Sequence, residues 1–288
     1  MGTRSRFTIL FTALFVISTA AVAVAQERGG GQRGQGGGRG GGGGQRGQGG
    51  GRGQQAPPPP PAHHPEARFD VETTNAGPIK ITPLAHASLR LEFAGKIMDI
   101  DPTGDYSWIS KSDLILITDI HGDHLQPTSV NVLKKQGTVI VAAPEVAAAV
   151  TGAMPLANGV TETVNAGGTQ IRVDAVPSYN LTRGPAAGQL YHTKGRGNGY
   201  IVTLGGKRIY MAGDTECLPE IKALRNIDVA FLPMNLPFTM TPEEAAECVK
   251  TFRPRVVYPY HYRGQDPKVF ENALRGENGI EVRLRDWY

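Results

Sequence analysis

The chain has 288 residues, of which 40% are hydrophobic and 19% charged, and its formal net charge is +4. The basic excess lies in residues 1–65, which hold seven arginines and one acidic residue, while acidic residues outnumber basic ones from residue 66 onward. This balance argues against a folded surface that binds polyanions, and the length beyond residue 66 suffices for one domain with a large core.

Residues 1–25 have the pattern of an export signal. Two arginines precede the apolar stretch FTILFTALFVISTAAVAVA, which ends in the small-x-small sequence AVA at 23–25. The apolar core is barely long enough to span a bilayer, so we expect a cleaved signal rather than a retained membrane anchor. The mature protein is then periplasmic or extracellular and has no stable membrane span.

Residues 26–69 are rich in glycine, glutamine, arginine and proline, and the repeat GGQRGQGGGRG occurs at both 30–40 and 43–53. This segment has almost no apolar side chains to offset the entropy of ordering, which predicts a disordered linker. Arg-Gly repeats also occur in RNA-binding segments, but behind an export signal a flexible tether is the better interpretation.

The predicted domain, residues 70–288, opens with the strand-like runs GPIKITPL, SLRLEFAG and KIMDIDP, whose alternation is typical of antiparallel strands with one buried face. DLILIT at 113–118 is continuously apolar, which predicts a strand covered on both faces. A helix at QPTSVNVLKKQG, a strand at TVIVAAP and a helix at EVAAAVTGA are expected to follow.

In the second half we expect strands at GGTQIRVDAVPSYN, GYIVTL, KRIYMAGD and DVAFLPM, then a helix, a strand, a helix and a strand at TPEEAAECVKTF, RVVYPYHY, PKVFENALRG and IEVRLRDW. Thr241 and Glu244 predict a capping box at the first of these helices. Mixed strands with interspersed helices predict an α/β architecture of layered sheets covered by helices.

Metal-capable side chains follow predicted strands at four places: DIHGDH after DLILIT, SYN after IRVDAVP, AGDT after RIYM, and YHY after RVVYP. Strand ends gathered at one sheet edge are where α/β proteins build their sites. One loop can turn His121, Asp123 and His124 inward together, and such nitrogen and oxygen donors favour a divalent metal site over a merely hydrogen-bonded polar loop.

The stretches LAHASLRLEF…KIMDIDP, ILITDIHGDHL, AVPSYN, YHTKGRGNGYIVTLGGKRIYMAGDTE, DVAFLPMN and PYHYRG occur in this order over about residues 78–265. Together they resemble the metallo-β-lactamase superfamily, in particular its branch of metal-dependent hydrolases that includes ascorbate-phosphate-lactonase-like proteins. The resemblance implies a four-layered αββα sandwich with its site at one edge of the two sheets.

The resemblance also implies a set of metal ligands. The family's ligand positions fall on Asp119, His121, Asp123, His124, Asp214 and His261. Asp214 matches the residue that bridges two metals, and a further family histidine falls near Asn180 in AVPSYN. One metal would then be held by Asp123, His124, His261 and the bridge, and the other by Asp119, His121, Asn180 and the bridge.

Asp119 and Asn180 depart from the family pattern at the same metal position. Oxygen donors in place of imidazole nitrogens are expected to make that position favour zinc less, and manganese, iron or magnesium more. Three outcomes remain open: two divalent metals of mixed preference, one metal, or a degenerate site. The joint presence of Asp123, His124, Asp214 and His261 argues against the last.

Two cations lower the pKa of a bridging water, which predicts hydrolysis with Asp123 as the catalytic residue that orients the water and moves its proton. The expected substrate is a small ester, lactone, amide or phosphodiester. The alternative is a non-catalytic metal- or ligand-binding module with a drifted site. The export signal and the acidic balance disfavour nucleic acid as a partner, and the sequence carries no signal for an oligomeric state.

Four residues are candidates for supporting roles. His86 in LAHASL and Asp101 in DIDP match family positions near the site, and Asp101 would orient a ligand histidine or the loop backbone. His192 and Lys194 lie in the glycine-rich loop YHTKGRGNG, which is suited to an anionic substrate group. Ordinary buried polar groups and an ordinary charged surface loop are the alternatives.

Cys217 and Cys248 are the only cysteines. Export would permit a disulfide between them. Because Cys217 lies beside the candidate ligand Asp214 and Cys248 falls within a predicted helix, we expect two free or buried thiols instead.

Overall fold

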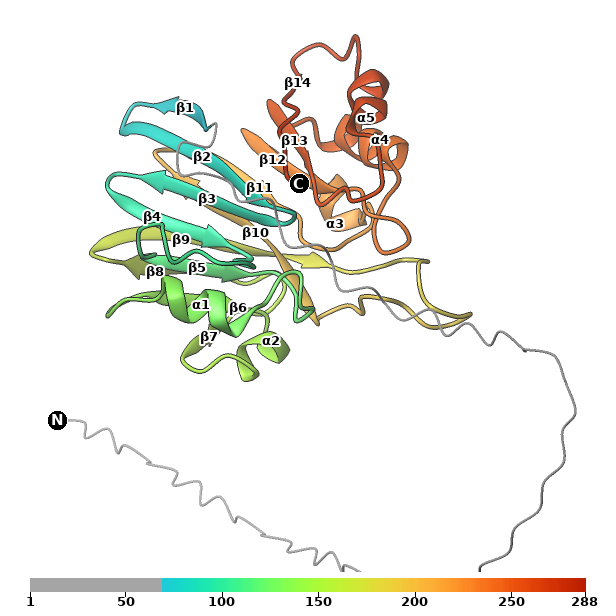
Figure 1. The fold of residues 1–288 in the computed structure, drawn as a ribbon. Helices are drawn as coiled ribbons and strands as arrows, with labels where there is room; N and C mark the ends of the chain where they lie inside the picture. Colours follow the sequence, from blue (N-terminus) through green and yellow to red (C-terminus); the bar gives the residue numbers. More distant parts are fainter. Residues whose placement is uncertain (1–68) are drawn as a thin grey trace, which may run out of the picture. The chain divides into compact units, whose positions relative to one another are not determined.

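The computed structural model describes residues 69–288, which form two seven-stranded mixed sheets with flanking helices (Figure 1). The predicted export signal, and the linker up to residue 68, lie outside the described residues. None of the helices within the described range has the length and hydropathy needed to cross a bilayer.

The first sheet has the strand order β1-β2-β3-β4-β5-β6-β7. Its strands are β1 (Asp70–Thr74), β2 (Gly77–Ala85), β3 (Ser88–Phe93), β4 (Lys96–Ile100), β5 (Leu114–Ile117), β6 (Val139–Ala142) and β7 (Ala153–Pro155). Strands β1 to β4 pair antiparallel through short turns. Strands β4 to β7 pair parallel, and the helices α1 (Pro127–Leu133) and α2 (Pro144–Ala148) connect β5 to β6 and β6 to β7.

The second sheet has the order β14-β13-β12-β11-β10-β9-β8. Its strands are β8 (Thr161–Ala166), β9 (Thr169–Ser178), β10 (Gly197–Leu204), β11 (Lys207–Met211), β12 (Val229–Pro233), β13 (Val256–Tyr260) and β14 (Glu281–Val282). Its helices are α3 (Pro219–Lys222), α4 (Pro242–Phe252) and α5 (Pro267–Ala273). Each half of the domain thus supplies one sheet and the helices that cover it.

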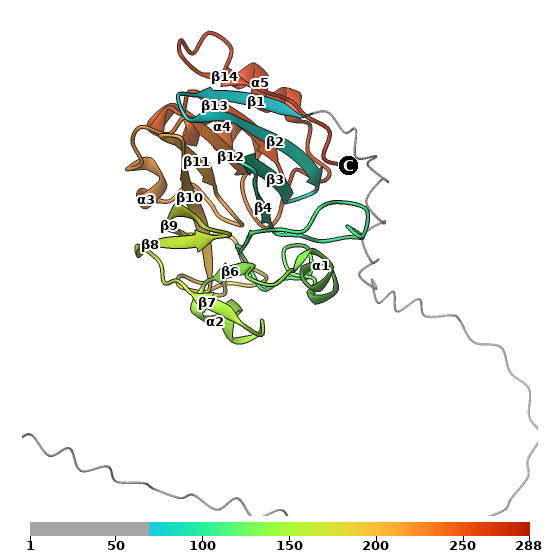
Figure 2. The same ribbon diagram turned by 90° about the vertical axis from the view of Figure 1, so that its left-hand side faces the viewer.

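Three apolar cores hold these layers together. Strand β5 shows the pattern: Leu114 and Leu116 point into the core between the sheets, while Ile115 and Ile117 pack beneath α1 and α2. A strand covered on both faces must be apolar at every position, so the prediction for DLILIT is confirmed. Helices α3, α4 and α5 cover the outer face of the second sheet (Figure 2), which confirms the αββα sandwich.

Helix α4 begins as the sequence predicts. The Thr241 hydroxyl accepts a hydrogen bond from the Glu244 N–H (3.1 Å), and the Glu244 carboxylate accepts one from the Thr241 N–H (2.8 Å). The reciprocal bonds satisfy two backbone donors that a helix start leaves unpaired.

The C-terminal segment differs from the prediction of one long strand. Only Glu281–Val282 pair with β13, after which the chain leaves the sheet edge and buries Trp287 in the core between the sheets. The gain from burying a large aromatic side chain outweighs continued pairing at an edge. The Trp287 carbonyl then accepts a hydrogen bond from the His86 N–H (2.8 Å), so the chain end is attached beside a candidate site residue.

The prediction for the cysteines is wrong. Cys217 and Cys248 form a disulfide that joins the segment before α3 to α4. Residues before α3 and residues within α4 pack in the same outer core, a proximity that neither local sequence reveals.

Candidate metal centre

The candidate residues meet where strands from both sheets end. His121, Asp123 and His124 follow β5 of the first sheet, whereas Asp214 follows β11 and His261 follows β13 of the second. The chain turns sharply before Asp214: Gly213 has φ +67°, and a Cβ there would lie 3.0 Å from both the Asn198 carbonyl and the Thr118 side chain. Only glycine fits this turn without strain.

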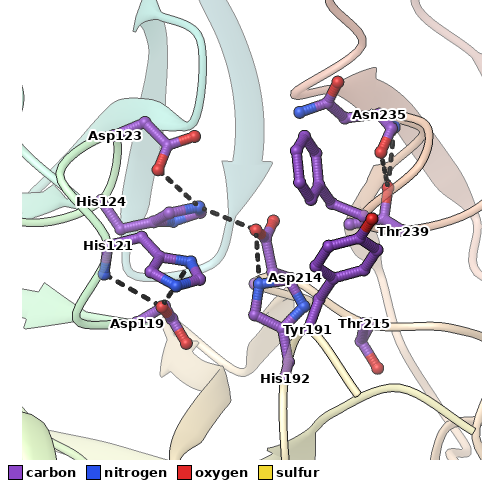
Figure 3. Close-up of polar contacts among 12 residues, drawn as sticks. Asp119, His121, Asp123, His124, Tyr191, His192, Asp214, Thr215, Asn235 and Thr239 are labelled. Atoms are coloured by element: carbon purple, nitrogen blue, oxygen red, sulfur yellow. Dashed lines mark hydrogen bonds and ion pairs between the residues drawn. The ribbon is translucent and has the colours of Figure 1, made fainter. Parts of the chain in front are cut away.

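The Asp214 carboxylate lies at the centre of the cluster (Figure 3). Its Oδ2 is 3.3 Å from Nε2 of His124 and 3.2 Å from Nε2 of His192, and its Oδ1 is 3.4 Å from Nε2 of His261. One carboxylate therefore faces imidazoles on two sides, which is the arrangement that a bridging metal ligand requires.

Most ligand atoms of this cluster have no hydrogen-bond partner. Unpaired and buried in the described structure are His124 Nε2, His192 Nε2, Asp214 Oδ1, and both ring nitrogens of His261. Buried polar atoms in proteins are nearly always paired, so four such imidazole nitrogens and one such carboxylate oxygen in a single cluster call for a cation. The nitrogen and oxygen donor set fits a divalent metal ion.

Asp101 orients His124. Its carboxylate accepts a hydrogen bond from His124 Nδ1 (2.8 Å) and is held by the Thr118 N–H (2.7 Å) and hydroxyl (2.5 Å). The hydrogen bond from Nδ1 leaves Nε2 of His124 facing Asp214, and outer carboxylates orient metal-binding histidines in this way. Asp101 thus contacts a histidine, His124, and the backbone at Thr118, the two kinds of group that we expected it to orient.

Asp123 is more open than Asp214, with 37% of its side chain exposed. Its Oδ2 lies 3.1 Å from His86 Nε2 and 3.4 Å from His261 Nε2. Burial, together with the nearby His261, lowers the pKa of His86 to about 4, so this ring is neutral at neutral pH. Its Nε2–H therefore donates to the carboxylate, and its Nδ1 accepts from the Tyr288 hydroxyl (2.6 Å).

Tyr288 has no counterpart in the sequence expectations. It is 202 residues from His86, and no local pattern marks a terminal tyrosine as part of a site. His86, which Tyr288 contacts, has a left-handed φ of 52°, and His261 and Asp101 have left-handed φ values of 48° and 47°. Such strained backbone concentrates at functional sites, where surrounding contacts hold it.

The structure corrects the expectation for Asn180. Its Oδ1 accepts hydrogen bonds from the His192 N–H and from His192 Nδ1 (both 2.8 Å), and its Nδ2 donates to the Phe238 carbonyl (2.8 Å). The amide therefore faces His192, and the His192 ring faces Asp214. The loop after β9 folds back on itself, and the Asn180 N–H donates a hydrogen bond to the His192 carbonyl. This turn places His192 in the cluster, although His192 does not directly follow a strand.

Lys194 also departs from its expected place. Its ammonium group pairs with Glu220 (2.7 Å), and 60% of its side chain is exposed. The lysine contacts that carboxylate at the surface, so the ordinary charged-loop interpretation describes it better than a role in substrate binding.

Asp119 lies beside His121 but is bound by Arg196. Arg196 Nη2 donates to both Asp119 oxygens (2.9 and 3.0 Å), and its Nε lies 3.2 Å from Oδ2. The ligand atoms of Asp119, His121 and His192 nevertheless lie within 4.8 Å of one another. Arg196 lies in the glycine-rich loop YHTKGRGNG, 77 residues from Asp119, and no local pattern pairs the two residues.

The charges of the central cluster are strongly coupled. Burial raises the pKa of Asp214, but His261 and His124 outweigh it and hold this pKa well below its ordinary value. Burial likewise opposes a charge on His124, yet Asp214, Asp101 and Asp123 hold its pKa well above the ordinary value. Metal binding therefore has to displace a proton from His124.

Comparison with known proteins agrees with this geometry. Residues 80–261 match the model of the beta-lactamase superfamily domain. A UPF0173 metal-dependent hydrolase of Thermococcus onnurineus is 34% identical over 213 residues, which cover 68% of this chain and 92% of that protein. A crystal structure from Parabacteroides distasonis, assigned as a metal-dependent hydrolase, is 39% identical with a TM-score of 0.72 and covers 77% of this chain and 100% of its own.

The archaeal metallo hydrolase Igni18 of Ignicoccus hospitalis is also similar, with 25% identity and a TM-score of 0.62 over 72% of this chain and 95% of that one. Sequence and fold therefore lead to the same assignment. The chain belongs to the UPF0173 metal-dependent hydrolase family of the metallo-β-lactamase superfamily.

Proposed function

We propose that this metal-dependent hydrolase activates a water at the Asp214 cluster and cleaves a small ester, lactone, amide or phosphodiester. The observation that carries the proposal is the set of buried, unpaired ligand atoms around one carboxylate. His124, His261 and Asp214 would hold a divalent ion, which would supply a Lewis acid for the substrate and lower the pKa of a water. His124, His261 and Asp214 match the three-ligand pattern of catalytic zinc, and manganese is the second candidate.

In this proposal Asp123 orients the attacking water and moves its proton. It is the most exposed carboxylate of the cluster, and because His124, His261 and His86 outweigh the effect of burial, its pKa is held well below the ordinary range, which keeps it ionised and able to accept a hydrogen bond from the water. Since His86 already donates to Oδ2, the Asp123 carboxylate is fixed in orientation and its Oδ1 remains able to orient a water.

The apolar side chains beside the cluster favour a substrate with an apolar part. Tyr191 lies beside His192 and Asp214 (Figure 3), and its ring packs edge to face against Phe238, with centroids 4.9 Å apart. Phe238 is 39% exposed. Exposed apolar residues that border a few polar groups are typical of small-molecule sites. Nucleic acid is disfavoured as a partner because acidic residues outnumber basic ones from residue 66 onward.

We also infer that the protein acts in the periplasm or outside the cell. The export-signal pattern of residues 1–25 supports this location. The Cys217–Cys248 disulfide supports it independently, since such bonds persist mainly in oxidising compartments.

The test is a panel of lactones, esters, amides and phosphodiesters offered to the purified protein with zinc or manganese. We expect turnover of at least one class, and a loss of about 10²–10⁴-fold in kcat for Asp123→Ala with the metal still bound. Glu247→Ala, on the exposed side of α4, is the control that should keep full activity. An Asp123→Ala variant with unchanged turnover would show that the proposed mechanism is wrong.

A further inference from the structure

We propose that Arg196 takes the place of one of the two metal ions that the family motif can hold. Arg196 forms an ion pair with Asp119, which is then no longer available to a metal. The protein therefore binds one divalent ion tightly, at His124, Asp214 and His261. This inference rests on the metal-binding part of the proposed function and adds the number of metals and the residue that sets it.

The Asp119 carboxylate has little capacity left for a metal. Oδ1 accepts from Arg196 Nη2 (2.9 Å) and from the His121 N–H (3.0 Å), while Oδ2 accepts from Arg196 Nη2 (3.0 Å) and Nε (3.2 Å). Two carboxylate oxygens offer about four lone-pair sites, and each of these oxygens already has two donors beside it. The pair is bidentate, the strongest form of arginine–carboxylate contact.

The guanidinium also covers His121. Arg196 Nη2 lies 3.3 Å from Nδ1 and 3.2 Å from Nε2 of that ring. Nearly equal distances to both nitrogens place Nη2 over the face of the imidazole rather than in line with either lone pair. A fixed positive charge at this distance repels a divalent cation that would use the same imidazole.

The Arg196 side chain is held in its position beside Asp119 by the surrounding structure. Only 15% of its side chain is exposed, and its Nη1 donates to the Tyr191 carbonyl (2.9 Å). The next residue, Gly197, starts β10 so close to the end of β5 that a Cβ would lie 2.8 Å from the Thr118 carbonyl and 3.2 Å from Asp119 Oδ2. The Asn198 N–H donates to that same carbonyl (2.9 Å), which anchors the segment.

The metal position formed by His124, Asp214 and His261 differs from the one at Asp119 because most of its ligand atoms have no hydrogen-bond partner. Four of the five unpaired ligand atoms belong to His124, Asp214 and His261. No lysine or arginine forms an ion pair with Asp214 or Asp123 in the described residues, where their ion-pair partners are histidines. A divalent ion on this side competes only with protons on the histidines and with no lysine or arginine, whereas on the other side the permanent charge of Arg196 already neutralises Asp119.

The experiment measures metal stoichiometry directly. The full chain is stripped of metal with a chelator and titrated with Zn²⁺ and, separately, with Mn²⁺ by calorimetry, and bound metal is counted after desalting. We expect one tight equivalent for the natural sequence. For Arg196→Met we expect a second equivalent bound at least tenfold more tightly than any second equivalent of the natural sequence, because Asp119 is released.

Electron paramagnetic resonance of the Mn²⁺ forms gives a second readout. The natural sequence should show the hyperfine pattern of an isolated ion, and Arg196→Met a spin-coupled pair. Arg172→Met, which removes an exposed arginine of β9 that pairs with Asp174, is the matched control and should keep one equivalent.

Two tight equivalents in the natural sequence would overturn the inference even if the variant failed to fold. An Arg196→Met protein that folds and still binds one equivalent would overturn it too. Two equivalents together with intact hydrolysis would leave the proposed function standing, whereas no bound metal at all would refute both.

Discussion

At the residue scale, this site depends on polar side chains that set the direction of each imidazole. Asp101 holds His124, Asn180 holds His192, and Tyr288 together with Asp123 holds His86. A histidine can bind a metal only through a nitrogen without a proton, so the partner of the other nitrogen decides whether it is a ligand. Residues that touch no substrate therefore control metal affinity.

Asp101→Asn tests this control. An asparagine can still accept from the Thr118 N–H, but its NH₂ would face His124 Nδ1 and favour a proton on Nε2, which points at Asp214. We expect metal affinity to fall about 10–100-fold, measured by competition with a chromophoric chelator. If the folded variant bound metal with unchanged affinity, Asp101 would not control metal binding through His124.

His86 should make the stability of the metal-free protein depend on pH. Its folded pKa of about 4 lies below the ordinary 6.5, so between these values the unfolded chain binds more protons than the folded one. Its contribution to stability is thus full above pH 6.5 and is lost as the pH falls toward 4. The loss should reach about 2 kcal/mol at pH 5.

Urea unfolding at pH 7 and pH 5 measures this loss. His86→Gln keeps a donor for Asp123 and an acceptor for Tyr288 but does not titrate, so the difference between the two pH values should shrink by the His86 contribution. If the free energy of unfolding changed equally with pH in both proteins, His86 would not be the group responsible for the change.

At the element scale, the segment after β11 carries Asp214 and is held from both ends. Ser178 donates to the Asp214 carbonyl (2.8 Å), and Cys217 bonds the same segment to α4. Glu216, between them, accepts from the N–H groups of Thr182 (3.2 Å) and Arg183 (2.7 Å), which fixes the start of the loop that returns to His192.

Removing the disulfide should destabilise the domain. Cys217 and Cys248 are separated by 31 residues, and a loop of this length corresponds to about 3–4 kcal/mol in the chain-entropy model. We expect Cys217→Ala/Cys248→Ala to lower the urea midpoint accordingly, and dithiothreitol to have this effect on the natural sequence but not on the variant. No difference between the two proteins would show that the bond adds no stability.

At the scale of the whole molecule, the metal centre joins the two sheets. His124 comes from the first sheet, while Asp214 and His261 come from the second, and each sheet is made by one half of the domain. A bound ion should therefore stabilise the packing of one sheet on the other, in addition to its local effect.

Metal removal tests this link. An ion at 100 times its Kd adds about 2.7 kcal/mol to the free energy of unfolding, so we expect zinc to raise Tm and EDTA to reverse the rise. Asp214→Asn, which removes the central carboxylate, should abolish the shift. A metal effect that persists in this variant would place the ion elsewhere.

Sequence alone determined the fold class, the family and the segments that meet at the sheet edge. These follow from local patterns: β5 is apolar at every position because both faces are covered, and the motif after it lies within a few residues. Only the tertiary structure decided that His192 rather than Asn180 faces Asp214, that Arg196 binds Asp119 across 77 residues, and that Tyr288 reaches His86. Such contacts depend on how loops return to the sheet edge, and a carboxylate looks the same in sequence whether a cation or an arginine neutralises it.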